Sequence, residues 1–115
     1  MRYTGSCHCQ AVKFEIETEI KDVMSCNCSI CQRRGHLLAF APMKNFKILA
    51  GESALKDYQW GQKQIHFTFC GTCGCAPFGR GESPEGPMAA VNARCLDGVD
   101  LDTLTVTKFD GRHLL

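Results

Sequence analysis

The cysteines constrain this chain more than any other feature. Nine occur in 115 residues, and seven of them fall into three close clusters: Cys7-x-Cys9, Cys26-x-Cys28-x-x-Cys31 and Cys70-x-x-Cys73. Thiols separated by one or two residues pair poorly as disulfides, because the short loop strains the bond geometry. The same spacing suits a tetrahedral metal site, in which two close thiolates come from one turn and two from another. We therefore interpret the clusters as metal ligands.

Composition places the chain among ordinary soluble globular proteins, with 44% hydrophobic and 22% charged residues. We expect one domain, residues 1–115. The net charge of +1, without a basic block, argues against nucleic acid or an anionic membrane surface as a partner. The longest apolar stretch, LLAFAPM, is too short to span a bilayer. Residues 1–25 lack the apolar run of a secretory signal, so we expect a cytoplasmic location, where thiols stay reduced.

Hydrophobic periodicity predicts short strands. In AVKFEIE, Val12, Phe14 and Ile16 alternate with charged residues, and QIHFTF alternates in the same way before Cys70. Further strands are expected in five short apolar or β-branched runs: 36–42, 46–51, 54–60, 88–93 and 103–109. GRGESPEGP, residues 79–87, is predicted to be a turn or exposed loop. Two short helical turns are expected, one from Cys28 to Arg34 and one capped by Asp100. The pattern predicts an all-β domain of small antiparallel sheets with zinc at their junctions.

A first metal centre is predicted from Cys7, Cys9, Cys70 and Cys73. The CxC and the CxxC lie about sixty residues apart, so a shared zinc would connect two distant strands. Four thiolates fill the coordination sphere of zinc and leave no position for substrate, so this site would stabilise the fold. The alternative is that Cys75 replaces one of the four as ligand.

A second centre is predicted from Cys26, Cys28 and Cys31, which supply three thiolates in six residues. Three protein ligands and one available position are typical of catalytic zinc. Zn²⁺ with three thiolates carries a net charge of about −1, which Arg33 and Arg34 immediately downstream would offset while attracting an anionic substrate.

Two alternatives remain for this second cluster. A fourth protein ligand would close the site and make it structural, and the candidates are Cys75, Cys95, His36 and His66. Otherwise the three cysteines would be reduced thiols in a loop.

Four segments in this order resemble the glutathione-dependent formaldehyde-activating enzyme family, also called the CENP-V/GFA domain: GSCHCQAVKFEIE, CNCSICQRRG, HFTFCGTCGCAPF and VNARCLDGVDLDTL. The resemblance spans nearly the whole chain. It implies a mainly β fold of the β-tent (Mss-four-like) class and two zinc ions per chain. It also implies a structural zinc on Cys7, Cys9, Cys70 and Cys73, and a catalytic zinc on Cys26, Cys28 and Cys31.

The activity implied by this resemblance is that of a carbon–sulfur lyase, which joins glutathione and formaldehyde as S-hydroxymethylglutathione. The thiol would bind at the open zinc as a thiolate and attack the aldehyde carbon. The adduct oxygen then needs a proton, for which His36, His66 and Asp97 are candidates. Cys75 departs from the family pattern, which has a small residue other than cysteine after CGTCG.

Several other side chains are candidates for substrate contact. Arg94 could bind a substrate carboxylate or pair with Asp97, and Trp60 with Tyr58 could line a small-molecule pocket or serve in packing. His8 and His113 are expected at the surface.

Two other functions compete with the lyase. One is a zinc-stabilised binding or chaperone module without catalysis, which a broad exposed apolar patch would favour. The other is a thiol redox enzyme that resembles methionine sulfoxide reductase B, with Cys95 as nucleophile. A low pKa at Cys95 would favour it.

Overall fold

The structure is a computed structural model that describes residues 1–61 and 63–112. Most of the regular structure is β-strand, which confirms the predicted fold class. The strands are β1 (Arg2–Ser6), β2 (Lys13–Glu17), β3 (Asp22–Cys26), β4 (Leu38–Pro42), β5 (Phe46–Ala50), β6 (Leu55–Tyr58), β7 (Ile65–Cys70), β8 (Phe78–Ser83), β9 (Gly86–Asn92) and β10 (Thr105–Phe109). The helical elements are α1 (Ser29–Arg34), η1 (Met43–Asn45), η2 (Glu52–Ala54), η3 (Ala93–Cys95) and η4 (Leu101–Thr103).

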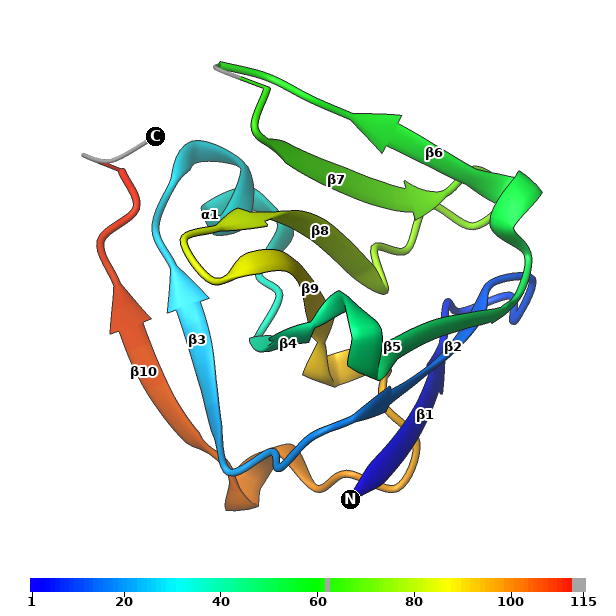
Figure 1. Ribbon diagram of the computed structural model, residues 1–115, viewed down its shortest axis with the longest axis horizontal. Helices are drawn as coiled ribbons and strands as arrows, with labels where there is room; N and C mark the ends of the chain where they lie inside the picture. The colour runs from blue at the N-terminus through cyan, green and yellow to red at the C-terminus, as the bar shows by residue number, and fades with distance from the viewer. Residues whose placement is uncertain (62, 113–115) are drawn as a thin grey trace.

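The strands form two sheets. The smaller has the order β1-β2-β5, and the larger has the order β10-β3-β4-β9-β8-β7-β6 (Figure 1). Strand pairing is antiparallel except between β10 and β3, which run in parallel. The parallel pair brings the end of β10 beside the end of β3, where Phe109 is in register with Cys26. The C-terminal residues therefore begin next to the second cysteine cluster.

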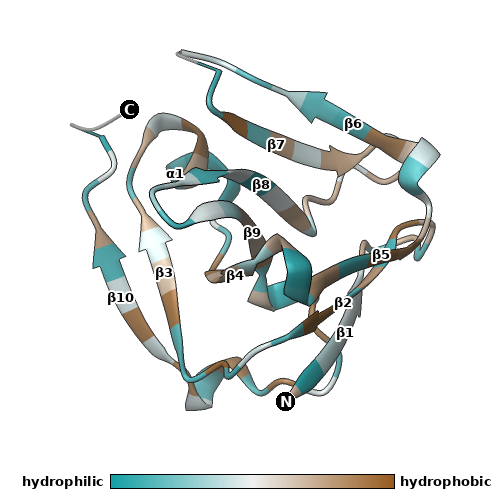
Figure 2. Cartoon of the chain, viewed as in Figure 1, coloured by the Kyte–Doolittle hydropathy of each residue, from teal (hydrophilic) through white to brown (hydrophobic). Residues whose placement is uncertain are grey.

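The core lies where the two sheets meet, and the alternation in β2 explains its position. Phe14 and Ile16 are completely buried, as is Val12 just before the strand. Phe14 packs edge-on against Phe78 of the larger sheet, with ring centroids 5.4 Å apart, and Phe46 of β5 lies 4.8 Å from Phe78. Figure 2 shows hydrophobic stretches on β2 and β5 where these strands approach the larger sheet.

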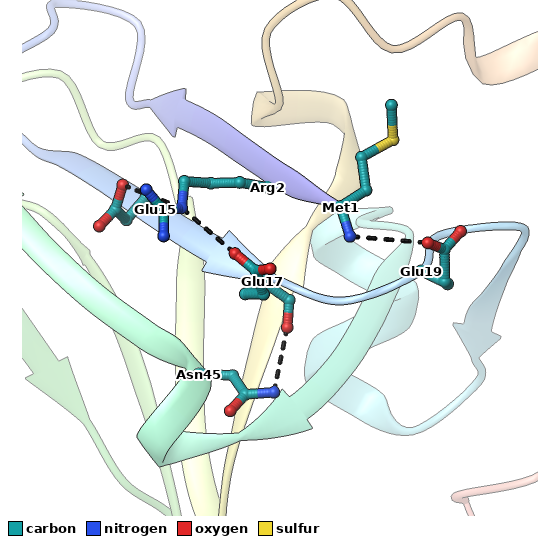
Figure 3. A network of polar contacts seen from close by, with 6 residues as sticks. All are labelled: Met1, Arg2, Glu15, Glu17, Glu19 and Asn45. Atoms are coloured by element: carbon teal, nitrogen blue, oxygen red, sulfur yellow. Dashed lines mark hydrogen bonds and ion pairs between the residues drawn. The ribbon is translucent and has the colours of Figure 1, made fainter.

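Polar contacts hold the outer face of the smaller sheet together (Figure 3). The Arg2 guanidinium on β1 lies 3.2 Å from a carboxylate oxygen of Glu17 on β2 and 4.0 Å from one of Glu15. The Asn45 side chain donates a hydrogen bond to the Glu17 carbonyl at 3.1 Å, which links η1 to the same strand. The Arg2 and Glu17 side chains are largely exposed, so their ion pair contributes little, about 0–1 kcal/mol.

Both predicted helical turns are confirmed. Helix α1 begins after Cys28 and ends at Gly35, whose φ of 68° and N–H bond to the Cys31 carbonyl close it. The Asp100 side chain caps η4 by accepting a hydrogen bond from the Asp102 N–H. None of the helices that the structure describes has the length or apolarity to cross a membrane.

The prediction of a turn or exposed loop over residues 79–87 is right for the turn at Pro84 and Glu85 and wrong for the residues on either side, which are in strands. This segment contains most of β8 and the turn into β9, with Ser83 in register with Gly86. The Ser83 hydroxyl donates to the Gly86 carbonyl at 2.8 Å and closes the turn. Two glycines in β8 remove the hydrophobic alternation by which a strand is recognised in sequence. The strand forms nevertheless, because its backbone is paired with that of β9.

Strand β7 also departs from simple alternation. Phe67 is buried, as predicted, but Thr68 on the opposite face is only 5% exposed. The Thr68 hydroxyl donates to the Phe78 carbonyl. The strand is therefore covered on both faces near its end, and a residue expected in solvent lies inside.

Candidate metal centres and adjoining cavities

The first group of clustered thiols contains Cys7, Cys9, Cys70 and Cys73, whose sulfur atoms all lie within 4.8 Å of one another. Cys7 and Cys9 come from the turn between β1 and β2, while Cys70 ends β7 and Cys73 follows it. The structure therefore brings together the four residues predicted for this centre. Cys75, the alternative ligand, lies outside the group.

Backbone amides point toward these sulfurs. The Val12 N–H donates to the Cys7 sulfur at 3.3 Å, and the Thr72 N–H donates to the Cys70 sulfur at 3.4 Å. Hydrogen bonds from the Cys9 and Cys75 N–H groups lower the pKa of Cys73 to about 6. Such bonds favour the thiolate, which is the form that binds metal.

The sulfur spacing fits zinc. A Zn–S distance of about 2.3 Å places the sulfurs of a tetrahedral site about 3.8 Å apart. The Cys7 and Cys9 sulfurs are 3.6 Å apart, and those of Cys9 and Cys70 are 3.7 Å apart. Four soft donors at this spacing could hold a metal ion and are consistent with zinc.

The second group contains Cys26, Cys28 and Cys31, again with all sulfurs within 4.8 Å of one another. Cys26 ends β3, Cys28 caps α1, and Cys31 lies in the helix. The Cys28 N–H donates to the Cys26 sulfur at 3.4 Å. Burial raises the pKa of Cys31, and so does the neighbouring Cys28 thiol. Three thiolates packed this closely need a cation to offset their mutual repulsion, so this group too could hold a metal ion.

His36 lies beside this second group but does not belong to it. Its Nε2 atom is 3.1 Å from the Cys31 sulfur, while the mutually close ligand atoms are the three sulfurs alone. The imidazole is buried, and burial together with the positive charge of Arg34 lowers its pKa to about 4. His36 is therefore neutral near pH 7 and can donate its Nε2–H to a Cys31 thiolate.

The C-terminal residues pack on the same cluster, which the sequence did not indicate. The Asn27 side chain donates to Asp110 at 3.1 Å and accepts from the Arg112 N–H at 3.0 Å. Gly111 is buried, and a Cβ atom on it would lie 2.5 Å from the Cys26 sulfur. A lone glycine a few residues beyond the last strand carries too little information to predict this contact from the sequence.

Two cavities near the second group share Arg34, and a third, of about 380 Å³, is lined by Cys26, Cys31 and residues 108–110 among others. The first, of about 360 Å³, has Cys26, Cys31 and Arg34 in its lining. The second, of about 490 Å³, has a mixed polar and apolar lining that includes two arginines and two aromatic residues: Ser29, Ile30, Arg33, Arg34, Tyr58 and Trp60. Arg34 lines both cavities, so each of them is next to a positive charge. The first group, by contrast, contributes no lining residue to either cavity.

Comparison with known proteins agrees with this geometry. The profile of the family described as "Glutathione-dependent formaldehyde-activating enzyme" matches residues 2–108. The chain belongs to this family. A crystal structure of a Rhodobacter sphaeroides protein is similar, with 31% sequence identity and a TM-score of 0.79 over 90% of this chain and 99% of that one. The resemblance inferred from the cysteine motifs is thus confirmed.

In this member of the formaldehyde-activating family, three of the four predicted substrate-contact residues meet at one place. Arg33, Arg34 and Trp60 line the same cavity beside α1. The indole Nε1 of Trp60 is buried and has no hydrogen-bond partner among the described residues. Arg94 lies apart from both cavities and donates from Nε to the Gly35 carbonyl at 3.2 Å, which ties η3 to the end of α1.

The three candidate proton donors lie in different parts of the structure. His36 lines the 360 Å³ cavity. His66 pairs instead with Asp57, Nδ1 to carboxylate oxygen at 2.6 Å, and Asp97 accepts from the Thr4 hydroxyl near the smaller sheet. His8 is exposed, as predicted, and His113 lies outside the described residues.

Cys75 and Cys95 form a separate pair, with their sulfurs 3.7 Å apart. Burial raises the pKa of Cys95 to about 12, and the neighbouring Cys75 adds to the effect. A redox nucleophile needs a low pKa, so this environment does not favour Cys95 in that role.

Proposed function

We propose that this chain is a zinc-dependent carbon–sulfur lyase, which forms or cleaves a thiol–aldehyde adduct of the S-hydroxymethylglutathione type at Cys26, Cys28 and Cys31. The observation that carries the proposal is the position of this three-sulfur group at the wall of a cavity. Three thiolate ligands leave one position for an incoming thiol, and the cavity provides access for the aldehyde.

The reaction requires no oxidant. The thiol sulfur forms a bond to the carbonyl carbon, the π electrons of the C=O bond move to oxygen, and the proton released by the thiol ends on that oxygen. Cleavage reverses these steps. A zinc ion held by the three cysteines would lower the pKa of the substrate thiol and fix its position.

The residues of the chain contribute charge and position. Arg34 lines both cavities and brings a cation to a centre whose net charge would be about −1. We propose that Arg33 and Arg34 bind carboxylates of the thiol substrate, since an Arg fork matches a carboxylate in two hydrogen bonds. Trp60 and Tyr58 would form the apolar wall of the same space.

The Cys7, Cys9, Cys70 and Cys73 group is proposed to hold a structural zinc, giving two zinc ions per chain. Four protein ligands complete its coordination, and the link between the β1–β2 turn and the end of β7 supports a folding role. We also propose a cytoplasmic location, because nine unpaired thiols suit a reducing compartment.

Elemental analysis of freshly purified protein tests the metal content, and exchange NMR with glutathione and ¹³C-formaldehyde tests the activity. We expect about two zinc ions in the wild type and about one in Cys28→Ser, and adduct exchange that is faster than the buffer rate in the wild type but not in Cys28→Ser. Cys95→Ser is the matched control and should keep both zinc ions and the exchange rate. One zinc that is insensitive to Cys28→Ser would remove the proposed centre and favour the binding module.

A further inference from the structure

The 360 Å³ cavity beside Cys26 and Cys31 has a floor of small residues. Three neighbouring strands place Phe40, Ala90 and Gly79 in register across β4, β9 and β8. Because Ala90 and Gly79 have almost no side chain, the sheet is hollow between the larger groups around them. Gly79 cannot carry a Cβ atom, which would lie 2.8 Å from the His66 carbonyl oxygen. Ala90 is therefore a position at which a larger side chain would fill the cavity.

The walls of this cavity are apolar. Leu38 of β4, Ile65 and Phe67 of β7, and Phe78 of β8 all contribute to the lining. Phe40 and Phe109 also line it and are 43% and 38% exposed. Large apolar side chains exposed together around a concave surface are typical of a binding site for an apolar group.

The polar groups in this lining already have partners. Asn92 accepts from the Leu37 and Arg94 N–H groups and donates to the Ala76 carbonyl. His36 faces the Cys31 sulfur, and the Arg34 guanidinium lies 5.8 Å from the centroid of the Phe69 ring. The cavity lining contains no carboxylate. A peptide thiol with two carboxylates and an ammonium group would find one cation here and no anion.

We propose that the aldehyde at this centre is apolar, and that its aryl or alkyl group occupies the 360 Å³ cavity while the carboxylates of the thiol lie at Arg33 and Arg34. This inference rests on the proposed lyase function and names its substrate class. A dry cavity of about 150 Å³ is enough to bind benzene. The observed volume therefore accommodates an aromatic or medium-chain aldehyde. Formaldehyde carries no group that would fill it.

The chemistry of the step is unchanged by this choice. The thiol sulfur bonds to the carbonyl carbon, the C=O π electrons move to oxygen, and the thiol proton ends on that oxygen, giving a hemithioacetal. Burial of the aldehyde substituent favours binding, because its apolar surface is removed from water.

The first test measures binding without reaction, using zinc-loaded protein and benzyl alcohol, which has the aryl group but no carbonyl. Trp60 is the single tryptophan, and its ring centroid lies 6.4 Å from that of the lining residue Phe67, so its fluorescence serves as the readout. Ala90→Leu should weaken benzyl alcohol binding at least about tenfold. Ala50→Leu, an identical change at an exposed position of β5, should not alter it.

A second variant keeps the test informative if Ala90→Leu does not fold. Phe40→Ser removes an exposed wall residue, and it should also weaken benzyl alcohol binding while the melting temperature stays near that of the wild type. Benzyl alcohol that binds no better than methanol, or that binds Ala90→Leu as well as Ala50→Leu, would overturn the proposal.

Activity then separates this proposal from the one on which it rests. With glutathione as the thiol, the wild type should favour benzaldehyde over formaldehyde in kcat/KM, and Ala90→Leu should lower this ratio at least about tenfold. Exchange with formaldehyde alone, and an unchanged ratio in Ala90→Leu, would overturn the apolar substrate and keep the lyase. No exchange with either aldehyde, together with benzyl alcohol binding that Ala90→Leu abolishes, would reject the lyase and keep the apolar site.

Discussion

The Nε2 atom of His36 lies 3.1 Å from the sulfur of Cys31, and both side chains are buried. The histidine follows α1 and the cysteine lies within it, so the turn at Gly35 brings them together. A donor held against one sulfur of a three-sulfur centre fixes the orientation of that ligand and offsets part of its charge. We therefore expect His36 to act on the centre through Cys31, by donating its Nε2–H to that sulfur.

His36→Phe should weaken metal binding at the second centre. The phenyl ring keeps much of the shape but lacks the N–H group, and loss of such a partner costs about 10–100-fold in metal affinity. Chelator competition followed by elemental analysis measures this, with an unchanged zinc content at the Cys7 centre as internal reference. His66→Phe is the matched control, because His66 pairs with Asp57 instead. Equal chelator sensitivity of the two variants would contradict this role for His36.

Gly111→Ala should disturb the same centre from the other side. The added Cβ would lie 2.5 Å from the Cys26 sulfur, a separation that a real side chain does not tolerate. Either the tail must leave Asn27 or Cys26 must move. We expect faster loss of one zinc ion to a mild chelator. Gly81→Ala controls for the substitution itself, since its Cβ would come no closer than 3.4 Å to any neighbour. Identical zinc loss from both variants would show that the tail contact has no effect.

Cys70→Ser should unfold the protein or lower its melting temperature sharply. A structural zinc supplies about 10–16 kcal/mol of binding free energy in small zinc domains, which equals or exceeds the stability of most domains, about 5–15 kcal/mol. Circular dichroism during heating measures the effect. Cys28→Ser, at the second centre, should lower the melting temperature much less than Cys70→Ser does. A Cys70→Ser variant as stable as the wild type would contradict the structural assignment.

The cysteine pattern predicted the two sulfur groups because metal coordination imposes a spacing that sequence displays directly. The alternation of Val12, Phe14 and Ile16 likewise predicted the core strand, and all three side chains are fully buried. Strand β8 was missed because Gly79 and Gly81 carry no hydrophobic signal, although backbone pairing with β9 defines the strand.

The surroundings of the second centre could be predicted only in part. His36 was a candidate at this centre because it lies five residues from Cys31, and it contacts the Cys31 sulfur through the turn at Gly35. Gly111 packs on Cys26 only because the parallel pairing of β10 with β3 brings distant segments together. The apolar cavity is equally invisible in sequence, since Ala90 becomes its floor through cross-strand register with Phe40. The metal-ligating cysteines can thus be recognised from short sequence motifs. The cavity that gives access to them cannot, because it depends on the packing of distant strands.

Cys95 should react slowly with alkylating reagents. Its pKa is raised from 9.0 to about 12, chiefly by burial, so the thiolate fraction near pH 8 is far below that of an exposed thiol. Iodoacetamide labelling of zinc-loaded Cys75→Ser protein, read by mass spectrometry, isolates Cys95 among the thiols outside the two groups. We expect a rate more than about tenfold below that of free glutathione, because the thiolate is the nucleophile.

The rate should also rise steadily from pH 8 to pH 10 without a plateau, since a raised pKa keeps the thiol protonated over that whole range. The same protein unfolded in urea, with zinc chelated, provides the control and should react at the rate of an ordinary thiol. Fast labelling of the folded protein at pH 7 would mean a lowered pKa at Cys95. A thiol redox function with Cys95 as nucleophile would then become a stronger candidate than the lyase.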